Sequence, residues 1–111
     1  MEYLLLIYED EKRFSQGYPP AELKEYQDFG KNHATAIKGG HALQPTRTAT
    51  TVRVRDGKRM TVDGPFAETK EQLGGFYLVE ARDLDEAIAM ATKIPGARSG
   101  SIEVRPIMKF S

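Results

Sequence analysis

The chain has 111 residues, 40% of them apolar, which is enough for one domain with its own core and argues against a disordered chain. Its 16 Lys and Arg residues balance its 16 Asp and Glu residues, so it lacks the basic excess that is usual in nucleic-acid-binding proteins. It contains no Cys, which excludes disulfides, thiolate metal sites and a cysteine nucleophile. No apolar run is long enough for a signal peptide or a membrane span, so we expect a single cytoplasmic domain over residues 1–111.

The first part of the chain predicts a buried strand and then a helix. The run YLLLIY at 3–8 is apolar at every position, as expected of a central strand buried on both faces. After a charged loop, Pro19-Pro20 lies where helix starts tolerate proline, and a helix is expected over about 20–38. Gly39-Gly40 is expected to end this helix, and 41–44 to form a short strand.

The turn at 55–57 is expected to join two strands, 50–55 and 58–63, into a β-hairpin. A two-residue Asp-Gly turn would distribute the apolar side chains of the two strands over both faces. A three-residue loop would pair Val52 with Met60, gather the apolar side chains on one face, and place glycine at a left-handed position. We therefore predict the three-residue loop.

The second half of the chain predicts a strand, a helix and a last strand. Residues 75–81 form the strand, and Asp83 with Glu86 matches a capping box at the start of a helix that ends at Pro95-Gly96. Residues 101–108 form the last strand. The order β, α, β, hairpin, β, α, β is that of split βαβ units. It predicts an α+β, ferredoxin-like sheet with an inserted β-hairpin and both helices on one face.

This predicted sheet has more apolar surface than its helices can cover. The strands at 3–8 and 75–81 are apolar on both faces, whereas two helices on one face leave the other face open. An uncovered face of this kind would expose several hundred Å² of apolar surface, more than a monomer usually shows. We therefore expect a homodimer in which a second copy covers the face. The alternative that the N-terminal loop or the hairpin folds over it remains open.

The stretch DGPFAETKEQLGGFYLVEARDLDEA at 63–87, followed by SIEVRPI, resembles the YCII-related family and, within it, the DGPF-domain branch. The resemblance covers nearly the whole chain and implies a ferredoxin-like fold and a dimeric α+β barrel, but no settled activity. Other YCII-like proteins carry a histidine near the start of the first helix that is proposed to belong to an acid–base pair. The corresponding stretch PPAELKEY has Glu22 instead, so a histidine mechanism is not transferred to that position.

Two residues are candidate catalytic groups. Asp63 ends a predicted strand, where it could serve as a general base or orient a ligand at the mouth of the barrel. The structural alternative for Asp63 is an Asx-type turn, and the isomer of the following Gly64-Pro65 bond is left open. His41 follows two glycines near the expected barrel end, where an exposed imidazole could act as an acid or a base.

Three further residues are candidate substrate-binding groups. Glu68 and Lys70 could line a polar pocket in which Lys70 holds an anion, although a solvated turn is the alternative. His33 lies in the apolar stripe of the first helix, where it could bind a substrate or transfer a proton, or could be a hydrogen-bonded core or interface histidine. Two histidines without a carboxylate cluster are a poor metal signature, so neither a metal nor a cofactor is predicted.

Two functions are compatible with these features. The first is a cofactor-independent small-molecule enzyme or ligand-binding protein with a cleft near the DGPF loop. The second is a non-catalytic dimeric module that binds a regulatory protein such as an extracytoplasmic-function sigma factor, with which some members of the branch are associated. We favour the first because concave barrel interiors are good small-molecule sites. Neither a nucleic acid nor a membrane is an expected partner.

Overall fold

The computed structural model describes residues 1–110 and contains two sheets and three α-helices. None of the helices in this part of the chain is long and apolar enough to cross a membrane. The elements in chain order are β1 (Glu2–Glu9), a 3₁₀ helix (Glu11–Phe14), α1 (Pro20–Asn32), β2 (Ile37–Ala42), a second 3₁₀ helix (Thr46–Thr48), β3 (Thr50–Arg55), β4 (Lys58–Asp63), β5 (Gln72–Glu80), α2 (Leu84–Thr92), α3 (Gly96–Ser99) and β6 (Ser101–Pro106).

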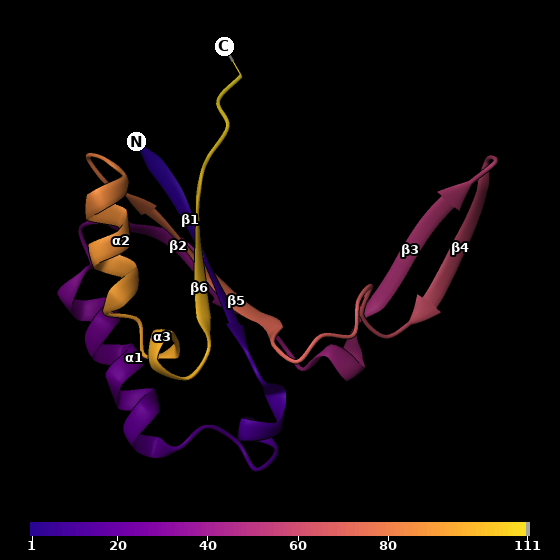
Figure 1. The fold of residues 1–111 in the computed structure, drawn as a ribbon, viewed down its shortest axis with the longest axis horizontal. Coiled ribbons are helices and arrows are strands. Elements are labelled where there is room, and N and C mark those ends of the chain that lie inside the picture. Colours follow the sequence, from indigo (N-terminus) through magenta and orange to yellow (C-terminus); the bar gives the residue numbers. More distant parts are fainter. Residues whose placement is uncertain (111) are drawn as a thin grey trace.

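The main sheet has four antiparallel strands in the order β2-β5-β1-β6, and β3 and β4 form a separate hairpin. All three helices lie on one side of the main sheet (Figure 1). With the hairpin set aside, this is the strand order of a ferredoxin-like sheet, and the hairpin is inserted between its second and third strands. The predicted α+β class is therefore confirmed.

The core lies between this sheet and the helices. Alternate residues of β1 point to the helix side, where Leu5 and Val79 of the neighbouring strand are fully buried. This alternation follows from the two-residue period of a strand. The buried core consists of Tyr3, Leu5, Ile7, Phe29, Val79, Ala81, Ala87, Met90, Ala91 and Ile94.

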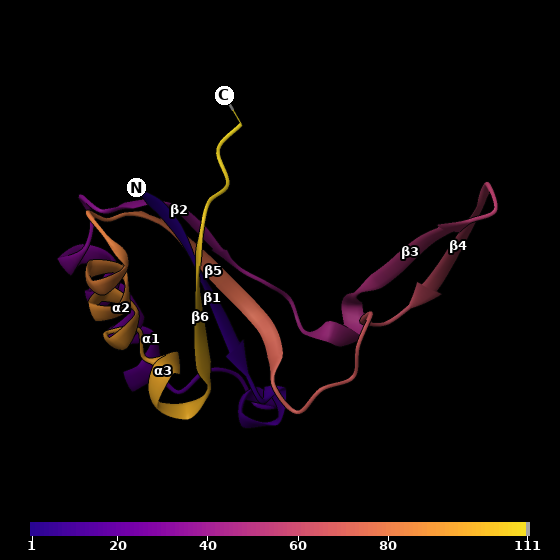
Figure 2. The ribbon, with the colours of Figure 1, turned by 45° about the horizontal axis from the view of Figure 1, so that its top comes forward.

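The opposite face of the main sheet, called the open face below, is also apolar. Leu4 and Leu6 of β1 pair with Leu78 and Phe76 of β5, so these four side chains share that face. In both views of the ribbon the three helices lie on the other side of the sheet (Figures 1 and 2). Leu6 is 8% exposed and the other three are half-buried, so part of this apolar face remains accessible.

The first helix is shorter than predicted. It ends at Asn32, and His33 caps it with a non-helical φ of −120°. The pair Gly39-Gly40 lies inside β2 and does not end the helix. A Cβ atom on Gly40 would lie 2.6 Å from the carbonyl oxygen of Phe76, so this glycine is required for the close approach of β2 to β5.

The predicted register of the hairpin is wrong. Val54 pairs with Arg59 across a two-residue turn, in which Asp56 has φ +52° and Gly57 has φ +75°. Two consecutive positive φ values are the mark of a type I′ turn, which matches the twist of the flanking strands. Eleven of the twelve strand residues are exposed, and Thr51 is half-buried, so no buried face selects the register that gathers apolar side chains.

The start of α2 agrees with the sequence. Asp83 accepts a hydrogen bond from the backbone N–H of Glu86 at 2.9 Å, and the Glu86 carboxylate accepts one from the backbone N–H of Arg82 at 3.0 Å. The helix ends at Thr92, and Pro95 precedes the short α3. The last strand ends at Pro106, two residues before the predicted end.

The hairpin of β3 and β4, called the arm below (residues 50–63), projects from the rest of the chain. Both views place it on the side of the main sheet opposite the helices (Figures 1 and 2). The two ends of the hairpin are joined at its base by hydrogen bonds from Gly64 N–H to the Ala49 carbonyl and from the Thr51 hydroxyl to the Gly64 carbonyl. The arm accounts for much of the width of a molecule that measures 46 × 45 × 19 Å.

Candidate acid–base site

Two carboxylates are buried where β1 ends and α1 begins. Glu9 is 4% exposed and Glu22 is 6% exposed. Side chains of this kind are almost never so deeply buried unless they are paired. Their burial therefore marks the most unusual chemical environment in the described part of the chain.

Local structure brings these two residues together. Glu9 is the last residue of β1 and continues the helix-facing series of Tyr3, Leu5 and Ile7. Glu22 lies in the first turn of α1, where a negative charge interacts favourably with the helix dipole. Gly96 leaves the necessary room, because a Cβ atom there would collide with the Glu9 carboxylate.

Arg13 connects the two carboxylates. One guanidinium nitrogen lies 3.0 Å from Glu9 Oε2, and the other lies 3.5 Å from Glu22 Oε1. The Tyr26 hydroxyl donates a long hydrogen bond of 3.5 Å to Glu9 Oε1. The second oxygen of Glu22, Oε2, is buried and has no hydrogen-bond partner among the described residues.

This environment favours proton retention. Burial raises the pKa of Glu9 above its ordinary 4.5, and the negative charge of Glu22 adds to the effect. Arg13 and the Tyr26 hydroxyl oppose the rise only in part. Burial and the neighbouring Glu9 also raise the pKa of Tyr26, so this phenol remains protonated and available as a donor. The cluster thus contains a carboxyl that can hold or release a proton.

The segment between β1 and α1 lies next to this cluster. Phe14 stacks on Tyr18 with ring centroids 4.1 Å apart, and Tyr18 meets Tyr26 edge-on at 6.5 Å. Arg13 lies over the Phe14 ring at 4.7 Å. Tyr18 is 40% exposed, so a thin surface layer separates the carboxylates from solvent on this side.

An open cleft of about 210 Å³ is lined by residues that follow Glu9 in the chain and by residues before and at the start of β5, but not by the residues of the acid cluster itself. Its acidic residues are already engaged: Asp10 accepts from the Lys12 backbone N–H at 3.0 Å, and Glu11 accepts from the Thr46 backbone N–H at 2.8 Å. The ammonium groups of Lys12 and Lys70 have no hydrogen bond or ion pair within residues 1–110. The cleft is lined by Asp10, Glu11, Lys12, Thr69, Lys70 and Gln72.

The structure places the predicted substrate-binding residues apart from one another. Lys70 lines the cleft, whereas the exposed Glu68 does not. The turn between them and β5 is not helical: the Thr69 hydroxyl donates to the Glu71 carbonyl, and the Gln72 amide donates to the Thr69 carbonyl. The Ser101 hydroxyl donates to the Glu71 carboxylate at 2.8 Å, which ties the end of this turn to β6.

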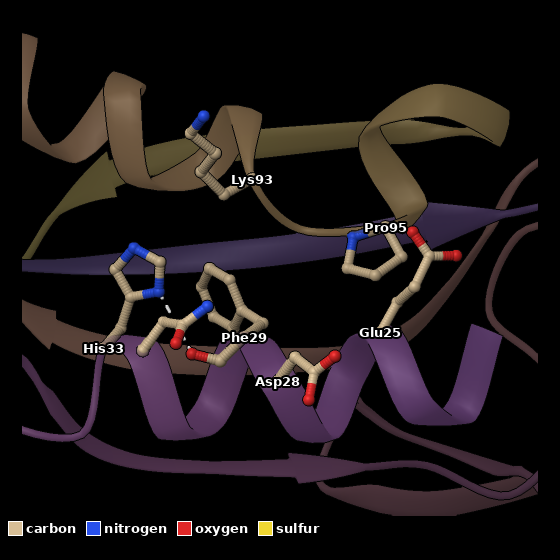
Figure 3. Close-up of a pocket in the computed structure, with 7 residues that line it drawn as sticks. Glu25, Asp28, Phe29, His33, Lys93 and Pro95 are labelled. Carbon is tan, nitrogen blue, oxygen red and sulfur yellow. Dashed lines mark hydrogen bonds between the residues drawn. The ribbon is translucent and has the colours of Figure 1, made fainter. Parts of the chain in front are cut away.

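His33 lies in a different groove, of about 390 Å³, between α1 and the segment before α3 (Figure 3). Its Nδ1 lies 3.0 Å from the carbonyl oxygen of Phe29, a contact in which Nδ1 is the donor. The two acids of this groove are already paired: Glu25 with Arg98 at 2.8 Å, and Asp28 with Lys24 at 3.2 Å. The acids of this groove are therefore engaged in ion pairs, one between α1 and α3 and one within α1.

The two predicted catalytic residues lie on different sheets. Asp63 is exposed at the end of β4 in the arm, and the following Gly64-Pro65 bond is trans. His41 is exposed on β2, where its ring meets Phe76 edge-on at 6.0 Å on the open face. Neither the described histidines nor the acids form a group of three that could hold a metal ion within residues 1–110.

Glu9, Arg13 and Tyr26 were not among the predicted site residues. The sequence does contain a signal for Glu9, because the two-residue period that buries Leu5 and Ile7 also turns position 9 toward the helices. No local sequence pattern predicts that Arg13 lies between the two acids, because that contact depends on the path of the segment between β1 and α1.

The fold and the buried acid pair define a small α+β protein with a ferredoxin-like sheet. The chain belongs to the YCII-related family, because the sequence model of the YCII-related domain matches residues 1–111. An uncharacterized protein of Rhizobium meliloti (strain 1021) is 38% identical over 117 residues, which cover 99% of this chain and 94% of that protein.

A solved structure shares the fold. It is the 5-chloro-2-hydroxyhydroquinone dehydrochlorinase of Burkholderia phenoliruptrix AC1100 in complex with 2,5-dihydroxybenzoquinone. The TM-score is 0.50 and the sequence identity 14%, and the match covers 97% of this chain and 94% of that one. At this identity the likeness supports the α+β fold and carries no residue roles.

Proposed function

We propose that this protein is a cofactor-independent small-molecule enzyme in which Glu9 and Glu22 exchange a proton with an anionic organic substrate. The observation that supports the proposal best is the buried acid pair that shares one guanidinium. If both carboxylates were ionised, the cluster would carry an uncompensated negative charge out of contact with water, which is costly. One retained proton removes that charge, so the pair can act as a general acid in one state and as a base in the other.

The unpaired Oε2 of Glu22 is the oxygen of the pair that is open to a substrate donor. A buried carboxylate oxygen without a donor is destabilised, whereas one that faces a substrate donor is not. Asp63 and His41 are less suited to this role, because both are exposed and they lie on different sheets.

The cleft that contains Lys12 and Lys70 supports an anionic substrate. Its acids are engaged with backbone and hydroxyl donors, while Lys12 and Lys70 are free to bind an anion. The aromatic layer of Phe14 and Tyr18 next to Arg13 would suit a flat, partly apolar substrate. An aromatic or unsaturated carboxylate or phenolate therefore fits best. The dehydrochlorinase likeness is consistent with small-molecule chemistry on this fold but does not supply the substrate.

We also propose that the protein works as a homodimer whose open faces meet. The open face carries Leu4, Phe76 and Leu78, which are half-buried, and Leu6, which is 8% exposed, and no helix covers them among residues 1–110. Burial of such a face by a second copy would remove apolar surface from water, which is the main driving force for association.

A ligand screen with matched variants tests the function. Aromatic and aliphatic carboxylates and phenols are added to the protein, and the melting temperature is measured. We expect at least one class to raise it, Lys70→Met to abolish the rise, and Lys31→Met, at an exposed site in the last turn of α1, to leave it unchanged. Glu22→Gln should keep binding but remove turnover of the same compound.

Two results would contradict the proposal. A binder whose effect is equal in wild type and Lys70→Met would place the site elsewhere. The absence of any binder, together with a stable protein partner, would favour the non-catalytic regulatory module instead.

A further inference from the structure

The arm has apolar side chains and no core of its own. Val52 and Val54 lie on one face and are 57% and 61% exposed, and Met60 and Val62 lie on the other face and are 50% and 61% exposed. An isolated two-stranded hairpin is at best marginally stable in water. A hairpin with apolar side chains on both faces is therefore expected to pack against something further.

The arm lies on the side where the main sheet is uncovered. In both ribbon views the helices are on one side of the sheet and the arm on the other (Figures 1 and 2). A second copy placed on the open face would lie on the same side as the arm. The two surfaces that lack a partner, the open face and the arm, would then meet the same neighbour.

The charges of the arm complement the rest of the chain. Its 14 residues contain four basic and two acidic side chains, whereas the other 97 residues contain 12 basic and 14 acidic ones. On the open face, the strand registers place Glu2, Glu80 and Glu103 beside Arg105, and the N-terminal ammonium pairs with Glu80 at 2.7 Å, which leaves one more acid than cations. A basic arm is thus suited to a partner whose exposed sheet margin is acidic.

The area of the open face alone is small for a stable dimer. Four strands about 4.8 Å apart and about six residues long give a footprint of about 400 Å² per copy, or about 800 Å² for two. Specific interfaces bury about 1,200–2,000 Å² in total. Two arms, each with about 200 Å² on one face and an equal area on the partner, would add about 800 Å² and bring the total into this range.

We propose that the arm of each copy clasps a second copy of this chain that is seated on the open face. This inference rests on the homodimer proposed above and goes beyond it, because the arms, and not the sheets alone, hold the pair together. Lys58, the first residue of β4 next to the turn, is then close to the partner copy.

Cross-linking tests the position of the arm directly. Lys58 is the only lysine of the arm, so cross-linked peptides that contain Lys58 report on the position of this segment. Equal amounts of ¹⁴N- and ¹⁵N-labelled protein are mixed and cross-linked, and Lys58 peptides are analysed by mass spectrometry. We expect mixed-isotope links from Lys58. Links of Lys58 that are confined to single chains, in a protein that is dimeric, would overturn the proposal.

Variants separate the arm from the sheet face. Val54→Glu with Val62→Glu changes one residue on each arm face and should weaken dimerisation by about tenfold or more in light scattering across a dilution series. The matched control, Leu84→Glu with Ile88→Glu, changes side chains of α2 that are 48% and 46% exposed and should leave dimerisation unchanged.

Three results would contradict the proposal that the arm clasps the second copy. They are a monomeric wild type, a dimer insensitive to the arm variant but broken by Leu78→Glu, and equal weakening by the α2 control. If the arm variant fails to fold, cross-linking of the wild-type protein still tests whether the arm contacts the partner copy. Because the ligand screen reads the Lys70 cleft and not dimerisation, failure of the clasp and failure of the proposed function give different results.

Discussion

The strand β1 and the arm use similar residues in opposite surroundings. In β1, Leu5 is fully buried and Ile7 is 8% exposed, whereas Val52 and Val54 of the arm are more than half exposed. The arm strands have apolar residues at alternate positions, whereas β1 is apolar at every position from 3 to 8. The difference is that β1 has a helix layer on one side and neighbouring strands on both edges, while the arm has neither.

This contrast shows what determines strand register. A one-residue shift of β1 would turn its helix-facing residues to the other side, so burial fixes the pairing there. In the arm no face is buried, so the turn at Asp56-Gly57 determines the register of the two strands. Buried strands are therefore set by packing, and exposed strands by local turn chemistry.

Truncation of a side chain in each region gives the largest expected difference. Leu5→Ala should lower the free energy of unfolding by about 2–5 kcal/mol, because it leaves a cavity in the core. Val54→Ala should change it by less than about 0.5 kcal/mol in the monomer. Urea denaturation at dilutions that keep the protein monomeric measures both. Equal losses would mean that the arm is part of the same cooperative core.

The sequence predicted the two central strands, β1 and β5, well because both are apolar along most of their length. It misplaced the edge strand β2, which was expected at 41–44 and runs over Ile37–Ala42. The run at 3–8, the capping box at Asp83 and the order of the elements each point to one arrangement, and the structure has it. The end of α1 was misplaced because Gly39-Gly40 has two possible uses, as a helix stop or in a close strand contact. Only the contact with Phe76 decides between them.

The candidate site was predicted only in part. Lys70 lines a cleft, but its predicted role in binding a substrate stays a prediction. The acid cluster involves residues from a strand end, a loop and a helix start. Contact among these residues depends on the path of the loop at 10–19, which no local sequence pattern specifies. Position 9 could be read as inward-facing from its period, yet its partner Glu22 could not.

Substitution of Gly96 tests the tight packing around the acid cluster. The expected loss of unfolding free energy is smaller than for the core truncation Leu5→Ala. Gly96→Ala should cost about 1–3 kcal/mol of unfolding free energy, because the new Cβ collides with the Glu9 carboxylate and lies 2.9 Å from the Tyr26 hydroxyl oxygen. Gly39→Ala is the control, since a Cβ there meets nothing within 4 Å. Thermal unfolding compares them, and equal effects would contradict the crowding at Gly96.

The pH dependence of stability tests the buried acid. Because burial and Glu22 raise the folded-state pKa of Glu9 above 4.5, the folded protein binds the proton more tightly than the unfolded chain. This contribution to stability is complete below pH 4.5 and is lost as the pH rises through the folded pKa. Each unit of pKa difference is worth about 1.4 kcal/mol. Glu9→Gln, which cannot ionise, should gain stability relative to wild type over that rise, as measured by urea denaturation at several pH values. A constant difference between the two proteins would contradict the raised pKa.

The smallest global effect is expected at the tip of the arm. Gly57 has φ +75°, so Gly57→Ala should destabilise the hairpin by about 1 kcal/mol. Since the arm shares little packing with the core, the loss should appear as faster amide exchange at residues 50–63 with almost no change in the global melting temperature. Gly30→Ala, in α1 with open space around its Cβ, should leave arm exchange unchanged. Slower folding or a lower melting temperature in Gly57→Ala would instead show that the arm and the main sheet unfold together, and the contrast between the two regions would then be one of exposure only.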